Sequence, residues 1–271
     1  MKFIFISFFL FFSSLIYADV NTPFQDGEEL KYDIKYKYGL VMLKAGNVQY
    51  KTTKSSYSNK PTYKSSLVFR TNSFFDKIYK VRDTLTSHVD MNLKPLYHVR
   101  SVNEGSTHFK EELVMKRHSV SYTEAYIKRE NKETVKFDTT LIADNLGYDI
   151  LNIFIFARTL DYPKLHTGET FNMSTFIGKR KVNVIVKYEG QSIVEKSPTL
   201  KYKAFRLAVD ITDDVFNESK NAMEMWISDD ENRLPIKIKA KLKIGAAEAE
   251  LSSHRNLKYP FTSEVKIVPR Q

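Results

Sequence analysis

Strict alternation of apolar and polar side chains is the feature that most limits the folds open to this chain. Apolar residues alternate with Lys or Asp over residues 30–38, and four lysines separate Ile, Ile, Ala, Leu and Ile over residues 236–244. Residues 182–187 follow the same pattern with one exception, Ile185. Successive strand residues point to opposite faces, so a period of two is typical of antiparallel strands with one buried and one solvated face. The sequence therefore predicts an all-β, mainly antiparallel protein.

One stretch near the middle of the chain breaks this period. Asp144 and Asn145 can cap a helix over about residues 146–158, with Leu151 and Phe154 on its apolar face. An isolated helix of about 13 residues is marginally stable in water. We therefore expect one central helix that packs against the concave side of a large curved sheet or half-barrel.

Turn residues recur at a nearly constant offset on the two sides of this helix. The matching pairs, about 140 positions apart, are Gly27 and Gly168, Asp90 and Asp230, Asn92 and Asn232, Pro95 and Pro235, and Gly105 and Gly245. They favour two similar β units, residues 19–143 and 165–271, joined by the helix and its connection at 144–164 in one continuous domain. The alternative is coincidence, because Asp, Asn, Gly and Pro are ordinary turn formers.

The N-terminus has the layout of a secretory signal peptide. Lys2 precedes an apolar run over residues 3–12, and residues 13–17 then lead to the small residue Ala18 directly before Asp19. The alternative is an uncleaved anchor, but the run is shorter than the ~20 apolar residues that a membrane span needs. We expect cleavage after Ala18 and release into a bacterial periplasm.

Composition excludes several classes of protein. The chain has no cysteine, which removes a lipoprotein attachment site, a thiol nucleophile and Cys-based metal centres. The formal charge of +10 comes from lysines spread along the chain, without a recognised nucleic-acid-binding module. No second apolar stretch is long enough for a transmembrane helix in the mature chain. The partners expected are an envelope lipid, glycan or protein, and not nucleic acid.

Signatures of catalysis and of metal binding are weak. The hydrolase, metalloprotease, P-loop and dinucleotide motifs are absent. Ser106 lies near His108 in the sequence, but a catalytic triad is recognised by the spatial roles of its members and not by proximity in the sequence. Two further sets have suitable ligand types without a recognised spacing: His88, His98, His108 and His118 for a transition metal, and Asp210, Thr212, Asp213, Asp214 and Asp229-Asp230-Glu231 for calcium. We predict no catalytic residue, no metal and no cofactor.

Aromatic and sulfur-containing side chains are the candidates for a ligand site. The single tryptophan lies in a Met-Glu-Met-Trp-Ile segment, and such side chains can contact an acyl chain or a sugar. Core filling between sheets is the alternative role. The candidate lining residues are Trp226, Met225, Tyr32, Tyr36 and Phe154.

Several short motifs resemble those of the bacterial exported family called "domain of unknown function 3108". The resemblance extends from about Phe24 to Leu251 and is most specific in the segment Trp226-Ile-Ser-Asp-Asp with Arg-Leu-Pro at 233–235. It implies an exported, mainly β protein with no assigned activity, and the Lys-, Phe- and Tyr-rich composition is similar to that of Bacteroidota members. The motif residues, for which we expect a structural role, are Gly27, Glu28, Arg82, Asp83, Asp90, Pro95, Arg158, Asp229, Asp230, Arg233, Pro235 and Gly245.

The function favoured by these observations is non-enzymatic binding in the cell envelope. One alternative is an envelope-polymer hydrolase that uses Asp229, Asp230 and Glu112 as paired carboxylates. A second alternative is an outer-membrane β-barrel, although the chain ends without an aromatic strand and a helix interrupts its middle.

Overall fold

The computed structural model describes residues 21–132, 134–212, 219–242 and 244–266. The expected signal peptide and the acidic residues Asp213 and Asp214 lie outside these ranges. The helices are α1 (Ser73–Asp76), α2 (Ile150–Thr159) and the 3-10 turn η1 (Tyr162–Lys164). The strands are β1 (Glu28–Tyr38), β2 (Val41–Tyr57), β3 (Lys60–Thr71), β4 (Arg82–Asp90), β5 (Pro95–Glu104), β6 (Thr107–Ser119), β7 (Tyr122–Asn131), β8 (Thr134–Ala143), β9 (Leu146–Tyr148), β10 (Thr170–Ile177), β11 (Arg180–Ser197), β12 (Leu200–Thr212), β13 (Ser219–Ser228), β14 (Pro235–Lys241), β15 (Ala246–Arg255) and β16 (Glu264–Lys266).

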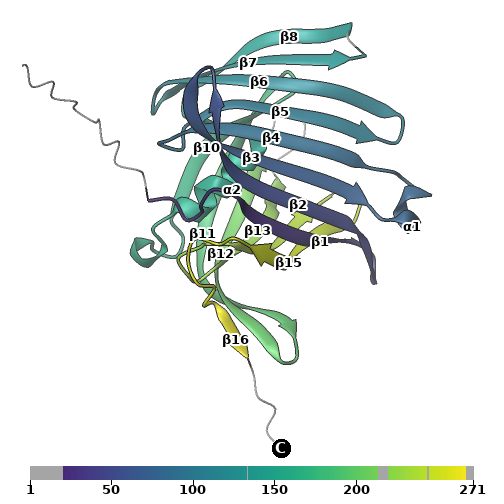
Figure 1. Ribbon diagram of the computed structural model, residues 1–271, viewed down its shortest axis with the longest axis vertical. Coiled ribbons are helices and arrows are strands. Elements are labelled where there is room, and N and C mark those ends of the chain that lie inside the picture. The colour runs from purple at the N-terminus through teal and green to yellow at the C-terminus, as the bar shows by residue number, and fades with distance from the viewer. Residues whose placement is uncertain (1–20, 133, 213–218, 243, 267–271) are drawn as a thin grey trace, which may run out of the picture.

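All these strands belong to one sheet, which confirms the predicted all-β class. The strand order is β8-β7-β6-β5-β4-β3-β2-β1-β15-β14-β13-β12-β11-β10-β9, with β16 paired to β12. Every pairing is antiparallel except that of β9 with β10. Strands β1–β8 form one half of the sheet, and β9–β15 form the other. The antiparallel pairing of β1 with β15 joins the halves (Figure 1).

The sheet closes into a roll by overlap of its ends rather than by hydrogen bonding between its edge strands. On β10, Met173 packs in the main core, whereas Phe176 points to the other face of the strand. Phe176 is buried there against Leu113, Ile127 and other side chains of β6–β8. Thr123 of β7 also binds the edge strand β9, because its hydroxyl accepts from the Gly147 backbone at 3.0 Å. One end of the sheet therefore lies over the outside of the other end.

The helix α2 lies inside this roll, as its apolar residues require (Figure 1). Ile153 and Ala157 pack against strand residues such as Met173, Leu207 and Met225 to form the largest core cluster. The helix is shorter than the predicted range of 146–158, because residues 146–148 form β9 and the capping residue is Asp149. Pairing with β10 thus competes successfully for the first residues of the expected helix.

The recurrent Asp–Asn–Pro turns adopt the same local conformation. The carboxylates of Asp90 and Asp230 each accept from the backbone two residues later, at 2.8 and 3.0 Å. The residue three positions after each aspartate, Leu93 or Arg233, has a left-handed φ of 60° or 50°. Two sequence motifs at an offset of 140 therefore form matching hairpin turns on the two halves of the sheet.

Within the described part of the chain, no helix is both long and apolar enough to cross a bilayer.

Candidate functional site

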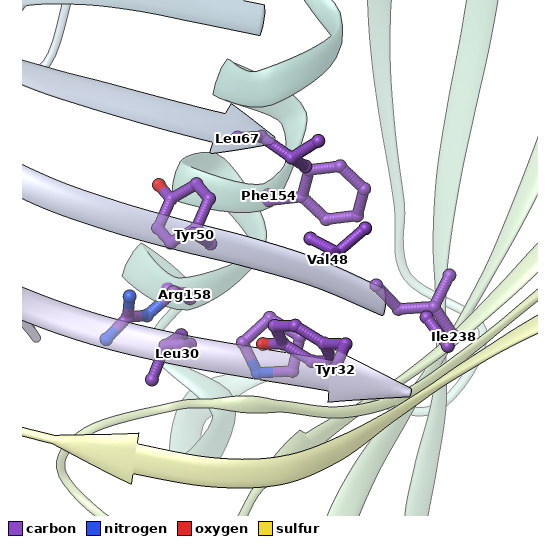
Figure 2. Close-up of a pocket in the computed structure, with 10 residues that line it drawn as sticks. Leu30, Tyr32, Val48, Tyr50, Leu67, Phe154, Arg158 and Ile238 are labelled. Atoms are coloured by element: carbon purple, nitrogen blue, oxygen red, sulfur yellow. The ribbon is translucent and has the colours of Figure 1, made fainter. Parts of the chain in front are cut away.

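An apolar cavity of about 170 Å³ lies between the inner face of the sheet and α2. Its walls come from β1, β2, β3, β14, β15 and the helix, and Phe154 of α2 faces Val48 and Leu67 of the strands (Figure 2). The cavity forms because the register of these strands aligns their inward-pointing residues. Tyr32 pairs with Val48, and Val48 pairs in turn with Phe69. The lining residues are Leu30, Tyr32, Val48, Tyr50, Leu67, Phe154, Arg158, Pro235, Ile238 and Ala249.

Arg158 is the one charged residue in this lining, and its charge is fully engaged away from the cavity. Its guanidinium donates to both carboxylate oxygens of Glu28, at 2.6 and 2.9 Å. It also donates to the carbonyls of Pro23 and Asn232. Both side chains of the ion pair are buried, at 2% and 0% exposure. Arg158 therefore ties α2 to β1 and to a turn of the second half, and offers no free charge to a ligand.

The two tyrosines in the wall are neutral at physiological pH. Burial raises the pKa of Tyr32 well above its usual value. Burial also raises the pKa of Tyr50, whose hydroxyl donates to Ser65 at 2.8 Å. The cavity wall consequently presents apolar and uncharged surface, which favours an apolar ligand or an apolar part of one.

The inner face continues beyond the cavity, toward the end of the roll away from α2. Ile34 and Leu85 lie on this face, because they pair with the lining residues Ala249 and Leu67. Phe69 lies on it too, because it pairs with Val48, and all three residues are half-buried. Farther out, Tyr36 of β1 lies at the strand end. A chain longer than the cavity can therefore remain in contact with apolar side chains as it leaves the cavity.

Four of the five predicted lining residues point into the roll. Tyr32 and Phe154 line the cavity itself. Met225 is fully buried in the core cluster beneath α2. Tyr36 lies near the C-terminal end of β1, where its hydroxyl donates to the Ile244 carbonyl at 3.0 Å.

Trp226, which the sequence analysis proposed as a lining residue, does not line the cavity. It pairs with Lys237 on the outer face, where Arg206 and Lys239 lie 5.9 and 5.7 Å from its ring centre. There it packs against the cluster around Val194. Met225 and Trp226 are neighbours on a regular strand, so they cannot share a face.

The remaining lining residues were not selected from the sequence as a site. Alternation marks Leu30, Ile236 and Ile238 as apolar positions, but a bulge in β14 separates the last two. Pro235 and Ile238 line the cavity, whereas Ile236 packs on the outside with Val194 and Tyr202. A β-bulge of this kind leaves no clear trace in the alternation of apolar and polar residues. Periodicity alone therefore does not identify which residues of β14 point inward.

A buried serine, histidine and aspartate meet at the start of α2. His98 Nδ1 lies 2.8 Å from Ser87 Oγ and 3.4 Å from Asp149 Oδ1. Ser87 donates to Asp149 at 2.7 Å, and the same carboxylate oxygen accepts from the Leu151 and Asn152 backbones. In a hydrolytic triad the serine and the acid contact different ring nitrogens. Here both face one nitrogen and Asp149 caps the helix, so the arrangement is structural.

The other sets considered for chemistry are not assembled into a site. Among the described residues, no group of three or more His, Asp or Glu side chains is placed to hold a metal. His88 lies beside Thr62, and His118 lies beside Glu124. Ser106 and His108 are both exposed. Glu112 instead binds Tyr97 and Lys110.

The family-motif residues are mostly turn and ion-pair residues. Arg82 binds Asp76, Arg158 binds Glu28, and Arg233 lies 3.7 Å from Asp229. Asp83 accepts from the Asn103 backbone, and Asp230 accepts from Ser228 and from the Ser263 backbone. The left-handed φ angles of Gly27 and Gly245 suit glycine at these turns. Arg158 and Pro235 have a second role, because both also line the cavity.

A sheet rolled around an apolar cavity and an internal helix defines a β-barrel-like protein. The chain belongs to the DUF3108 family, described as "Protein of unknown function", and the family model matches residues 31–252. The resemblance seen in the short motifs is thereby confirmed.

The comparison with solved structures agrees on the fold. The chain is similar to the "Beta-barrel-like Protein of Domain of Unknown Function DUF1849 from Brucella abortus", with a TM-score of 0.60 and 12% identity. The match covers 87% of this chain and 100% of that chain. At this identity the similarity supports the fold and not a shared activity. A search of curated proteins found no match.

Proposed function

We propose that this protein is exported to the periplasm and binds an amphiphile whose apolar chain enters the cavity beneath α2. The observation that carries the proposal is the cavity wall itself, which is apolar apart from an arginine already paired with Glu28. The volume of about 170 Å³ is similar to that of an engineered cavity of ~150 Å³ that takes up benzene. The cavity therefore accommodates one end of an acyl or isoprenoid chain.

The direction of binding follows from the distribution of polar groups. The deep end of the cavity has no available charge, because four oxygen atoms surround the Arg158 guanidinium. The half-buried apolar residues continue toward the end of the roll at Tyr36. A ligand therefore binds with its chain end beside α2 and its head group toward the end of the roll near Tyr36.

The two alternative functions fit the observations less well. Glycoside hydrolysis needs two carboxylates flanking a substrate, and the cavity lining includes none. A membrane β-barrel presents an apolar band outward. The outward face of β1, β14 and β15 instead carries ion pairs such as Lys35–Glu250 and Lys237–Glu248. Export itself rests on the signal-peptide layout of residues 1–18.

The proposal is tested with variants that narrow the cavity from one wall. Ala249→Phe places a ring among the lining residues, whereas Ser253→Phe adds the same ring to the exposed outer face of the same strand. Titration with a fluorescent long-chain fatty acid should show binding about tenfold weaker, or lost, for A249F and unchanged for S253F. Val48→Phe narrows the opposite wall and serves if A249F does not fold.

A second measurement identifies the natural ligand. Native mass spectrometry of the protein purified from its own cell envelope should detect a bound amphiphile that A249F lacks. Co-purification of no amphiphile, together with equal probe binding by A249F and S253F, would refute the proposal.

A further inference from the structure

Exposed apolar side chains gather at one end of the molecule. Ten of the seventeen large hydrophobic residues that are exposed in the described chain lie in three short segments. Leu40 is 103% exposed and Ile78 is 68% exposed. We call this surface the apolar rim: Tyr38, Leu40, Val41, Met42, Leu43, Phe74, Ile78, Tyr79, Leu242 and Ile244.

The three segments are held together although they are far apart in the sequence. Tyr36 joins them, because its hydroxyl donates to the Ile244 carbonyl and its ring lies edge-on to Phe75, with centroids 6.5 Å apart. The Asn72 backbone donates to Ala45 at 2.9 Å and fixes the α1 segment beside β2. In Figure 1, α1 and the β1–β2 tip project from the same side of the molecule. The rim is therefore one composite surface.

Positive charge accompanies the apolar rim. The described residues within 36–44, 72–80 and 240–246 include five lysines and one acidic residue, Asp76. The carboxylate of Asp76 is engaged by Arg82 at 2.5 Å. Lys37, Lys77 and Lys80 are exposed among the apolar side chains. Apolar tips surrounded by lysines match the interface of an anionic bilayer, where apolar groups insert and lysines meet phosphates.

We infer that the apolar rim docks this protein on the surface of an anionic lipid bilayer. The tips of the β1–β2 and β14–β15 turns and of α1 enter the head-group region, and the lysines lie at the phosphates. Exposed apolar patches of this extent mark interaction sites on proteins in water. The rim also lies at the end of the roll toward which the inner apolar face leads. This docking role goes beyond binding of an amphiphile and does not depend on it.

The test is co-sedimentation of the exported form, purified from the envelope, with vesicles. The protein should bind vesicles of phosphatidylcholine with about one third phosphatidylglycerol, and bind pure phosphatidylcholine vesicles much more weakly. High salt should weaken the binding, because it screens the lysines. The double variant Leu40→Ser with Ile78→Ser should lower the partition coefficient about tenfold or more, because it removes inserted apolar groups.

Matched controls keep this result interpretable. Val120→Ser with Ile142→Ser removes side chains that are 79% and 55% exposed outside the rim, and should leave vesicle binding unchanged. All four positions are exposed, so both double variants should fold. A249F should still bind vesicles, and the rim variant should still bind the fatty-acid probe, so the two proposals can fail separately. Equal vesicle binding by the two double variants would overturn the inference. So would a protein that binds no vesicles and instead forms a dimer that the rim variant abolishes.

Discussion

Arg158 and Glu28 form a fully buried ion pair that connects α2 with the first strand. A buried charge is costly to desolvate, and the pair offsets that cost through two direct hydrogen bonds and the carbonyls of Pro23 and Asn232. The pair contributes mainly by fixing where the helix lies inside the roll. That position also fixes the floor of the cavity, because Arg158 lines it.

Removing one partner of this pair should be strongly destabilising. Arg158→Met leaves the Glu28 carboxylate buried without its cation, and should lower the free energy of unfolding by about 3–5 kcal/mol. Chemical denaturation measures this change. Arg255→Met is the matched control, since Arg255 is 73% exposed where it faces Glu29, and should change stability by less than about 1 kcal/mol.

The double variant tests the pairing itself. Glu28→Gln with Arg158→Met should destabilise by less than the sum of the two single changes, because the double variant buries no unpaired charge, whereas each single variant buries one. Additive losses would contradict the role of the ion pair.

At the scale of elements, α2 begins at a cap shared with two strands. Asp149 accepts from the first backbone amides of the helix and from Ser87 of β4, and His98 of β5 lies against both. Burial lowers the pKa of His98, so the folded protein keeps the imidazole neutral. The helix start is thus tied to the inner face of the first half of the sheet.

This cap should make stability depend on pH. The unfolded chain protonates histidine near pH 6.5. Below that value the unfolded state binds more protons than the folded state, so the free energy of unfolding falls as the pH falls toward the lowered pKa of His98. The slope from one group is at most about 1.4 kcal/mol per pH unit.

The variant His98→Gln should flatten this acid-side slope, and the exposed His108→Gln should not. Urea denaturation at a series of pH values measures both slopes. A slope that H98Q leaves intact would show that His98 is not the group responsible.

At the scale of the whole molecule, closure of the sheet depends on overlap. Phe176 is 6% exposed and carries the contact between the outside of β10 and the inside of β6–β8. The first and last strands of the path belong to adjacent parts of the sequence, 134–143 and 146–148. At this overlap, which we call the seam, side-chain packing therefore holds the two ends of the sheet together, as backbone hydrogen bonds hold neighbouring strands together elsewhere in the roll.

The variant Phe176→Ala should open the seam. We expect a loss of about 3–5 kcal/mol in the free energy of unfolding, together with faster amide exchange in β8 and β9. Phe74→Ala removes the same ring from a position that is 57% exposed, and should change stability by no more than about 0.5 kcal/mol. Similar losses in the two variants would mean that Phe176 does not close the roll.

Local patterns in the sequence were sufficient for the class of fold. Alternation at residues 30–38 predicted a two-faced strand, and the Asp–Asn–Pro motifs at 90–95 and 230–235 predicted turns that adopt the same conformation. The break in alternation predicted one helix, whose start was displaced to Ile150 by the pairing of β9 with β10. These features depend on neighbouring residues, and neighbouring residues are what a sequence displays.

The site was decided by the tertiary structure. Tyr32 and Phe154 meet across the cavity only because the roll brings β1 over α2, and the bulge in β14 turns Ile238 inward and Ile236 outward. The same packing left Trp226 on the outer face. The sequence by itself determined two-faced strands, their turns and one helix, because each follows from local periodicity. Which apolar faces enclose the cavity, and which tips gather at the rim, depended on register and closure, because these bring together residues far apart in the sequence, such as Tyr32 and Phe154 or Tyr36 and Ile244.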